Sequence, residues 1–201
     1  MKKILSAFCL ALAMPLSVFA ASFSEGTHYS TLSGFKKSEQ PEVREAFSVY
    51  CPACYKWDQG IVGDLEKKLD SKQIPFSQSH VSFMGKYASQ ISQALAVTKG
   101  TEKFDPVKKA MFKALHENRI GDWKNDEEFF KVLSEAGLSK REWTFGLNDP
   151  KVRERMQAWS ELEKNVRSVP SFIVNNKYLV NLSSIKSIDE FYSLIDYLLE
   201  N

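Results

Sequence analysis

The sequence has few cysteines and almost no net charge, and each shortage excludes a class of protein. Among its 201 residues there are three cysteines, 27 Lys and Arg, and 25 Asp and Glu. A small exported protein held together by several disulfides would carry more cysteine pairs. Nearly balanced charge leaves no basic stripe, so we expect no nucleic-acid partner. Internal repeats, low-complexity tracts and long linkers are also absent from the sequence.

Residues 1–20 have the three-part layout of a secretory signal. After Lys2 and Lys3 comes an uncharged apolar run over residues 4–13, and cleavage is expected after Ala20. The alternative is an uncleaved membrane anchor, but the run is short for a span of about 20 residues. We therefore expect a soluble, exported mature chain of one domain, residues 21–201.

The residues that follow predict a strand, a helix and a second strand. Val43–Tyr50 is rich in aromatic and β-branched residues, which is typical of a buried strand. Pro52 suits the first position of a helix, where its missing N–H would be unpaired anyway. Gly60 and Gly63 weaken that helix and predict a kink. Ile74–Phe83 alternates apolar and polar residues and predicts the second strand.

Between residues 85 and 166 the apolar spacing is helical throughout. Asn125 with Glu128, and Ser139 with Glu142, each have the spacing of a capping box at a helix N-terminus. We expect the apolar stripes of these helices to form core. The stripes are Tyr87, Ile91, Ala94 and Leu95, then Val107, Ala110, Met111, Ala114 and Leu115, and finally Val152, Met156, Trp159, Leu162 and Val166.

Strand signals return near the C-terminus. Residues 172–174 and 178–180 flank Asn175-Asn176-Lys177, a pattern typical of a hairpin because asparagine tolerates positive φ. A last amphipathic helix follows. The order β-α-β, helical block, β-β-α predicts an α/β fold with a thioredoxin-like sheet and an inserted helical subdomain. The expected parts are the signal peptide 1–20, the first thioredoxin-like part 21–84, the insert 85–166 and the second part 167–201.

Cys51 and Cys54 lie where the first predicted strand meets its helix. A thiol at a helix N-terminus faces unpaired N–H groups and the positive end of the helix dipole, which both favour the thiolate. We expect Cys51 to be exposed and nucleophilic, and Cys54, one turn further, to be a buried resolving thiol. Such a pair exchanges disulfides through a mixed disulfide with substrate. The only redox group required is the Cys51–Cys54 disulfide, without metal or other cofactor.

Two other interpretations of the cysteine pair remain open. A zinc site needs four ligands, and the available histidines (His28, His80 and His116) are far apart in sequence. A structural disulfide between Cys51 and Cys54 would close a very small loop, which constrains the unfolded chain little. Redox exchange fits the strand-to-helix position best.

Three segments carry a resemblance to a known family. Residues 45–55 (EAFSVYCPACY), 80–84 (HVSFM) and 169–178 (VPSFIVNNKY) resemble DsbA-type thiol:disulfide oxidoreductases of the bacterial periplasm. The similarity covers essentially the whole mature chain, including the position of the helical insert. The expected fold is therefore the thioredoxin-like fold with an inserted helical subdomain.

The resemblance also implies roles for residues around the cysteines. Val169-Pro170 matches a cis-proline loop beside the reactive cysteine, where Val169 pairs with an extended substrate. Pro52 and Ala53 complete the implied substrate-binding set, and His80 is expected to be structural. Glu45 matches a buried acid that helps proton transfer to and from the second cysteine; a solvated strand residue is the alternative.

The sequence departs from the family at two positions. Ala53 stands where the best-known members have histidine, so we expect a higher Cys51 pKa and a less oxidising disulfide than theirs. Gln78 stands where we align a lysine that pairs with the buried acid. Without a cation nearby, Glu45 is expected to ionise less readily.

The function implied is a dithiol oxidase. It would donate its disulfide to reduced exported proteins in the periplasm and be reoxidised by a DsbB-type membrane quinone reductase. A reductase or isomerase of the same fold is the alternative, although such isomerases carry an N-terminal dimerisation domain and we expect a monomer here. A non-catalytic binding protein is a third possibility. A shallow apolar surface around Cys51, Pro170, Met84 and His80 would receive the substrate, although we expect the alternative, structural role for His80.

Overall fold

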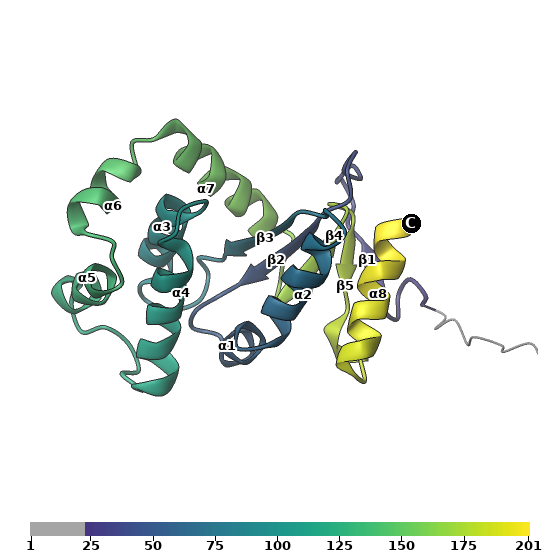
Figure 1. Cartoon of the computed structure of the whole chain (residues 1–201), viewed down its shortest axis with the longest axis horizontal. Helices are drawn as coiled ribbons and strands as arrows, with labels where there is room; N and C mark the ends of the chain where they lie inside the picture. Colours follow the sequence, from purple (N-terminus) through teal and green to yellow (C-terminus); the bar gives the residue numbers. More distant parts are fainter. Residues whose placement is uncertain (1–22) are drawn as a thin grey trace, which may run out of the picture.

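The computed structural model describes residues 23–201, so the expected signal peptide, with Cys9, lies outside the described residues. A five-stranded sheet of order β1-β5-β4-β2-β3 lies at its centre (Figure 1). Strands β2 and β3 are parallel, and the other neighbouring pairs are antiparallel. The predicted α/β architecture is present. The strands are β1 (Tyr29–Thr31), β2 (Val43–Phe47), β3 (Phe76–His80), β4 (Ser171–Val174) and β5 (Tyr178–Val180).

The helix after β2 is broken in two, as the glycines indicated. Helix α1 (Pro52–Asp58) ends just before Gly60, and α2 (Ile61–Asp70) starts after it. Gly63 lies inside α2 without a break. In Figure 1, α1, α2 and the last helix, α8 (Ile188–Glu200), lie on the same side of the sheet. The core there includes Phe172, from β4, and Phe191, from α8.

The segment between β3 and β4 is helical, as the apolar spacing predicted. Figure 1 shows α3 to α6 gathered at one end of the molecule, with α7 running back toward β4. The division into subdomains stays a prediction, because Phe47, the last residue of β2, and Val49 share one core with these helices. The helical elements are α3 (Ala88–Thr98), α4 (Phe104–Phe112), a π-helical turn (Lys113–Glu117), α5 (Asp126–Glu135), α6 (Lys140–Gly146) and α7 (Pro150–Glu163).

Most local signals in the sequence correspond to observed contacts. Ser139 and Glu142 form a complete capping box, whereas Asn125 caps α5 without the return bond, because the Glu128 carboxylate accepts from the Lys124 N–H instead. Asn175 and Asn176 have φ of 52° and 53° in the β4–β5 turn. Among residues 23–201, none of the helices combines the length and apolar composition needed to span a bilayer.

Candidate functional site

The cysteine pair lies at the N-terminus of α1, where the sequence predicted it. Cys51 is the N-cap residue and Pro52 the first helical residue. The backbone N–H of Cys54 donates to Cys51 Sγ over 3.2 Å. This is the contact that a side chain at an N-cap makes with the first turn of its helix. Both cysteines are free thiols in this structure.

The two thiols have opposite acidities because their surroundings differ. Hydrogen bonds from the Cys54 thiol and from the backbone N–H groups of Cys54 and Ala53 lower the pKa of Cys51 to about 6, against an opposing effect of burial. Burial, followed by the Cys51 sulfur, raises the pKa of Cys54 far above its ordinary range. At neutral pH the pair therefore consists of one thiolate and one thiol.

The expectation that Cys51 is an exposed residue is wrong. Only 5% of Cys51 is exposed, because the loop before β4 lies against it. In the thiol form Cys51 Sγ donates to the carbonyl oxygen of Val169 over 3.2 Å. The Val169–Pro170 bond is cis, as the resemblance implied. Pro52 and Ala53 are exposed beside the sulfur, so an approaching group meets the first turn of α1 and this loop.

His80 is a structural residue, as expected, and takes no part in an exposed surface. It is 1% exposed, its Nε2 accepts from the Val49 N–H, and its Nδ1 lies 2.8 Å from Ser92 Oγ. Burial lowers the pKa of His80 to about 3. Met84 is half-buried, while the neighbouring Phe83 is 47% exposed. Phe83, rather than His80, therefore supplies exposed apolar surface after β3.

Glu45 is a buried acid and not a solvated strand residue. It lies on β2 opposite Gln78 of β3 and is 1% exposed. The Gln78 Nε2 donates to Glu45 Oε2 over 2.7 Å. Desolvation raises the pKa of Glu45 to about 8, with the Gln78 hydrogen bond and the charge of Lys108 opposing it. Burial thus brings the pKa of Glu45 into the neutral range, and its role in proton transfer stays a prediction.

A cation does lie near Glu45, contrary to our expectation. The Lys108 ammonium donates to Gln78 Oε1 over 2.8 Å and pairs with the Asp58 carboxylate at 2.6 Å. We did not identify Lys108 or Asp58 from the sequence. A signal was nevertheless present, because Lys108 has the helical spacing of Phe104 and Met111 and so occupies a core position of α4.

Three hydrogen bonds from the segment after β3 hold the turn between β2 and α1. The Tyr50 hydroxyl donates to Asp122 Oδ1 over 2.8 Å and accepts from the Tyr87 N–H. His116, from the π-helical turn, lies 2.7 Å from the Val49 carbonyl oxygen through Nε2. These contacts were not predicted, because hydrogen bonds across 37 to 72 positions leave no periodic signal in a single sequence.

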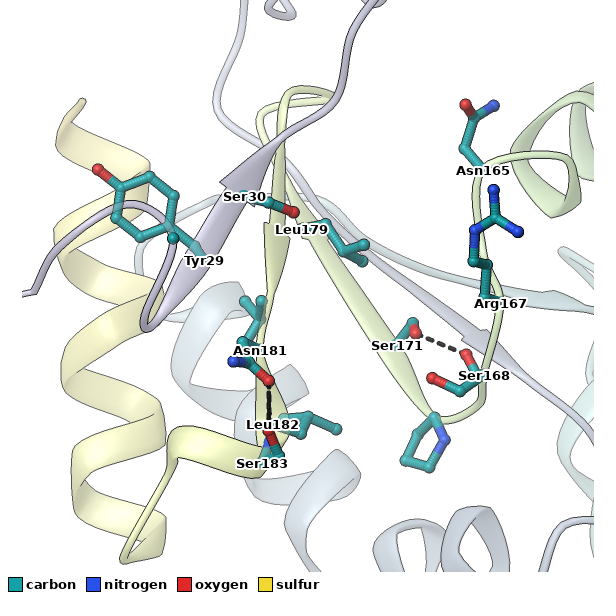
Figure 2. Close-up of a pocket in the computed structure, with 13 residues that line it drawn as sticks. Tyr29, Ser30, Asn165, Arg167, Ser168, Ser171, Leu179, Asn181, Leu182 and Ser183 are labelled. Carbon is teal, nitrogen blue, oxygen red and sulfur yellow. Dashed lines mark hydrogen bonds between the residues drawn. The ribbon is translucent and has the colours of Figure 1, made fainter.

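A groove of about 470 Å³ shares Pro170 with the cysteine site. Figure 2 shows Arg167 and Ser168 on the loop before β4, facing Ser30 and Leu179 on β1 and β5 across the groove. Its lining mixes hydroxyl and amide groups with apolar carbon. Among the described residues no group of three or more His, Cys, Asp or Glu side chains is placed to hold a metal ion.

Comparison with known proteins agrees with this geometry. Residues 33–196 match the thioredoxin family. The chain is 32% identical to the thiol:disulfide interchange protein DsbL of Lelliottia amnigena, over 92% of this chain and 90% of that protein. It is 31% identical to the corresponding DsbA of Pectobacterium carotovorum, over 90% and 86%.

Solved structures show the same fold. Salmonella enterica DsbL superposes with a TM-score of 0.79 at 29% identity, covering 90% of this chain and all of that one. Pseudomonas aeruginosa DsbA superposes with a TM-score of 0.73 at 26% identity, covering 89% and 93%. The thiolate at the helix N-terminus, the cis-proline loop and these similarities lead to one conclusion: the chain belongs to the thioredoxin family and is a disulfide oxidoreductase of the DsbA and DsbL type.

Proposed function

We propose that this oxidoreductase donates its Cys51–Cys54 disulfide to exported proteins. A substrate thiolate attacks Cys51 Sγ, the Cys51–Cys54 bond breaks, and the electron pair and a proton go to Cys54. A second substrate thiolate then attacks the substrate sulfur of the mixed disulfide, and Cys51 leaves as a thiolate. Overall, a substrate dithiol is oxidised to a disulfide, the protein is reduced to the Cys51 thiolate and the Cys54 thiol, and one proton is released.

The lowered pKa of Cys51 is the observation that carries the direction of transfer. Hydrogen bonds at the start of α1 stabilise the Cys51 thiolate, which exists only in the reduced protein. Whatever stabilises the reduced form relative to the disulfide makes the disulfide a better oxidant. A low pKa also makes Cys51 a good leaving group in the second step.

Substrate would bind as an extended chain across the loop before β4. The backbone of Val169 lies beside Cys51 Sγ and pairs with the chain as an added strand. Pro52 and Ala53 contact the residues next to the substrate cysteine, and the groove of Figure 2 receives residues beyond Pro170. The mixed polar and apolar lining of the groove suits varied unfolded sequences.

The proposed location is the periplasm, reached with the signal peptide of residues 1–20 and cleavage after Ala20. The proposed reoxidant is a DsbB-type membrane quinone reductase, which takes electrons from reduced Cys51 and Cys54. We propose that the protein acts as a monomer and uses no metal or other cofactor.

A trapping experiment tests the proposal. Cys54→Ser removes the resolving thiol, so Cys51 should accumulate mixed disulfides with exported proteins on non-reducing gels. Cys51→Ser is the matched control and should trap none. A Cys54→Ser protein that carries no partners at Cys51 would contradict the mechanism.

A reductase or isomerase is the alternative function. Rapid acid quenching of cells, followed by alkylation of free thiols, shows which state of Cys51 and Cys54 predominates. An oxidase is held mostly as the disulfide, and a reductase mostly as the dithiol. A non-catalytic binding protein would keep its activity after Cys51→Ser.

A further inference from the structure

A chain of four buried side chains runs from the far end of α1 to the acid beneath the cysteines. Lys108 on α4 pairs with Asp58 on α1 at 2.6 Å and donates to Gln78 Oε1 on β3 at 2.8 Å. Gln78 donates in turn to Glu45 on β2 at 2.7 Å. The side chains of Lys108 and Asp58 are 6% and 10% exposed, and Glu45 and Gln78 are buried.

The chemistry of these groups fixes the direction of every hydrogen bond. An ammonium group only donates, so Gln78 must present its carbonyl oxygen, Oε1, to Lys108. The amide nitrogen then faces Glu45 and donates to Oε2. A donor at Oε2 favours the carboxylate and leaves Oε1 of Glu45 to carry the proton when the group is neutral. Without Lys108 the amide of Gln78 can turn over, since its two ends have the same shape.

The charges around Glu45 come from several elements. Lys108 favours its ionisation, while Asp58 and the Cys51 sulfur oppose it, and the effect of Lys108 exceeds that of Asp58. Asp105, one turn earlier on α4, lies 3.5 Å from Lys108 and is exposed. The charge of Glu45 in turn raises the pKa of Cys54.

We propose, on the basis of the proposed exchange reaction, that Lys108 is a positioning residue for proton transfer: it acts through the Gln78 amide to set how readily Glu45 gives its proton to Cys54. When the Cys51–Cys54 bond breaks, its electron pair goes to Cys54 Sγ. The Glu45 carboxylic acid gives its proton to that sulfur and becomes a carboxylate. The Gln78 N–H, held by Lys108, stabilises this carboxylate. When the disulfide forms again, Glu45 takes the proton back.

A buried lysine with a carboxylate partner also has a purely structural interpretation, as an ion pair that joins α4 to α1. That interpretation predicts a loss of stability when Lys108 is replaced, but no change in the acidity of Glu45. The two interpretations therefore differ in a quantity that can be measured without any assay of activity.

The test is a pH titration of the Glu45 carboxyl carbon by NMR in the full mature chain labelled at glutamate. Lys108→Gln keeps hydrogen-bonding capacity toward Asp58 and Gln78 but removes the charge. It should move the Glu45 midpoint upward by about one pH unit, a tenfold change in the protonation equilibrium. Lys109→Gln is the matched control, an exposed lysine of the same helix, and should leave the midpoint unchanged. Equal midpoints in the two variants would overturn the proposal.

A second variant keeps the test informative if Lys108→Gln does not fold, because that change leaves Asp58 buried without a partner. The double variant Lys108→Gln/Asp58→Asn removes both charges. Its Glu45 midpoint should still rise, by less than in the single variant, because Lys108 acts on Glu45 more strongly than Asp58 does. A fall in the midpoint, or no change, would overturn the proposal.

Kinetics provide a readout that separates this inference from the proposed function. Glu45 acts as an acid only while protonated, so the alkaline limb of the single-turnover rate of disulfide reduction should move to higher pH in Lys108→Gln. Mixed-disulfide trapping at Cys51 should persist when Lys108→Gln is combined with Cys54→Ser. Absence of trapping by Cys54→Ser alone contradicts the proposed function. An unmoved alkaline limb with trapping intact contradicts only the role of Lys108.

Discussion

At the scale of single residues, Cys51 and Cys54 show how position within one helix turn sets chemistry. Cys51 caps α1 and accepts a hydrogen bond from the Cys54 N–H, while Cys54 is 1% exposed and lies in the core. Helix termini stabilise negative charge through unpaired N–H groups, and a low-dielectric core opposes it. The nucleophile and the resolving thiol are therefore distinguished by geometry and not by residue type.

Ala53 limits how far the Cys51 pKa falls. Reactive thiols at helix N-termini have pKa values from about 3.5 to 7.5, and about 6 is in the upper half of that range. Ala53→His would place a side chain that can carry positive charge beside the sulfur. We expect the Cys51 pKa to fall by about one unit, and the reduction potential to rise by about 30 mV for a tenfold change in the exchange constant. Equilibration with glutathione measures the second effect, and an unchanged potential would contradict the role given to position 53.

Glu45 makes stability depend on pH. Its pKa is raised on folding to about 8, so folding disfavours the charged form. The resulting loss of stability begins above the unfolded pKa, about 4.3, and is complete above the folded value. Glu45→Gln should therefore leave stability nearly unchanged at pH 4 and increase it by about 2–4 kcal/mol at pH 8. Urea unfolding at the two pH values tests this, and equal effects at both would contradict the burial of an ionisable acid.

Part of the site could be predicted from the residues themselves, and part could not. Local signals in the sequence mark the start of a helix at Cys51 and Cys54 and the start of a strand after Pro170. Lys108 and Asp58 join the site through contacts between α4, β3 and α1, which depend on how the helices pack. The pKa of Glu45 depends on neighbours that only this packing brings together, so it could not be predicted from the sequence.

At the scale of elements, the turn between β2 and α1 is held from outside by the segment after β3. The ring of Tyr50, one residue before the reactive cysteine, lies where a Cβ on Gly85 would be. Gly85 has a φ of 91°, which favours glycine, and the Tyr50 hydroxyl bonds to Tyr87 and Asp122. The reactive turn is thus held by the close approach of the Tyr50 ring to the backbone at Gly85.

Gly85→Ala should disrupt that approach. It combines an unfavourable φ with a clash against Tyr50, and we expect a loss of about 2–4 kcal/mol. Gly100→Ala is the matched control, since its φ is 83° but no atom lies within 4 Å of the added methyl group; it should cost about 1 kcal/mol. Urea denaturation measures both. Equal losses would show that Tyr50 yields to the methyl group.

The elements found from sequence are those with strong periodicity. Strand β1 was missed, because Tyr29–Thr31 is a three-residue edge strand with no apolar alternation. The π-helical turn at Lys113–Glu117 was missed because its apolar spacing is that of an α-helix, while the Asn118 N–H bonds to the Lys113 oxygen. Strand β2 ends at Phe47 rather than Tyr50, since the next residues form the turn into α1.

At the scale of the whole molecule, two parts of the chain have different roles. Helices α2 and α8 pack on it with the core around Phe172 and Phe191, and this part holds the fold. The helical segment between β3 and β4 contributes side chains that contact Gln78, Tyr50 and Val49 at the site, namely Lys108, Asp122 and His116. Thiol chemistry and its tuning thus come from different parts of one chain.

The stabilised Cys51 thiolate should also increase the free energy of unfolding of the whole reduced protein. The folded pKa of Cys51 is lowered, so its contribution is present above the unfolded pKa, about 8.5, and is lost as pH falls through about 6. The stability of the reduced protein relative to the oxidised protein should therefore increase between pH 5 and pH 8, below the pH at which the raised pKa of Cys54 begins to oppose it. We expect about 1–2 kcal/mol after allowing for solvent screening. Denaturation of both forms measures it, and a difference independent of pH would contradict a stabilised thiolate.

The central claim is that the start of α1 holds Cys51 as a thiolate at neutral pH. The most direct measurement is the rate at which iodoacetamide alkylates Cys51, as a function of pH. It is made on the reduced wild type, in which only Cys51 is reactive, and on the Cys54→Ala variant. In the wild type the rate should follow a titration with a midpoint near 6. The variant lacks the Cys54 thiol hydrogen bond, so its midpoint should be higher but still below the ordinary value. A wild-type midpoint at the ordinary thiol value, about 8.5, would contradict the account.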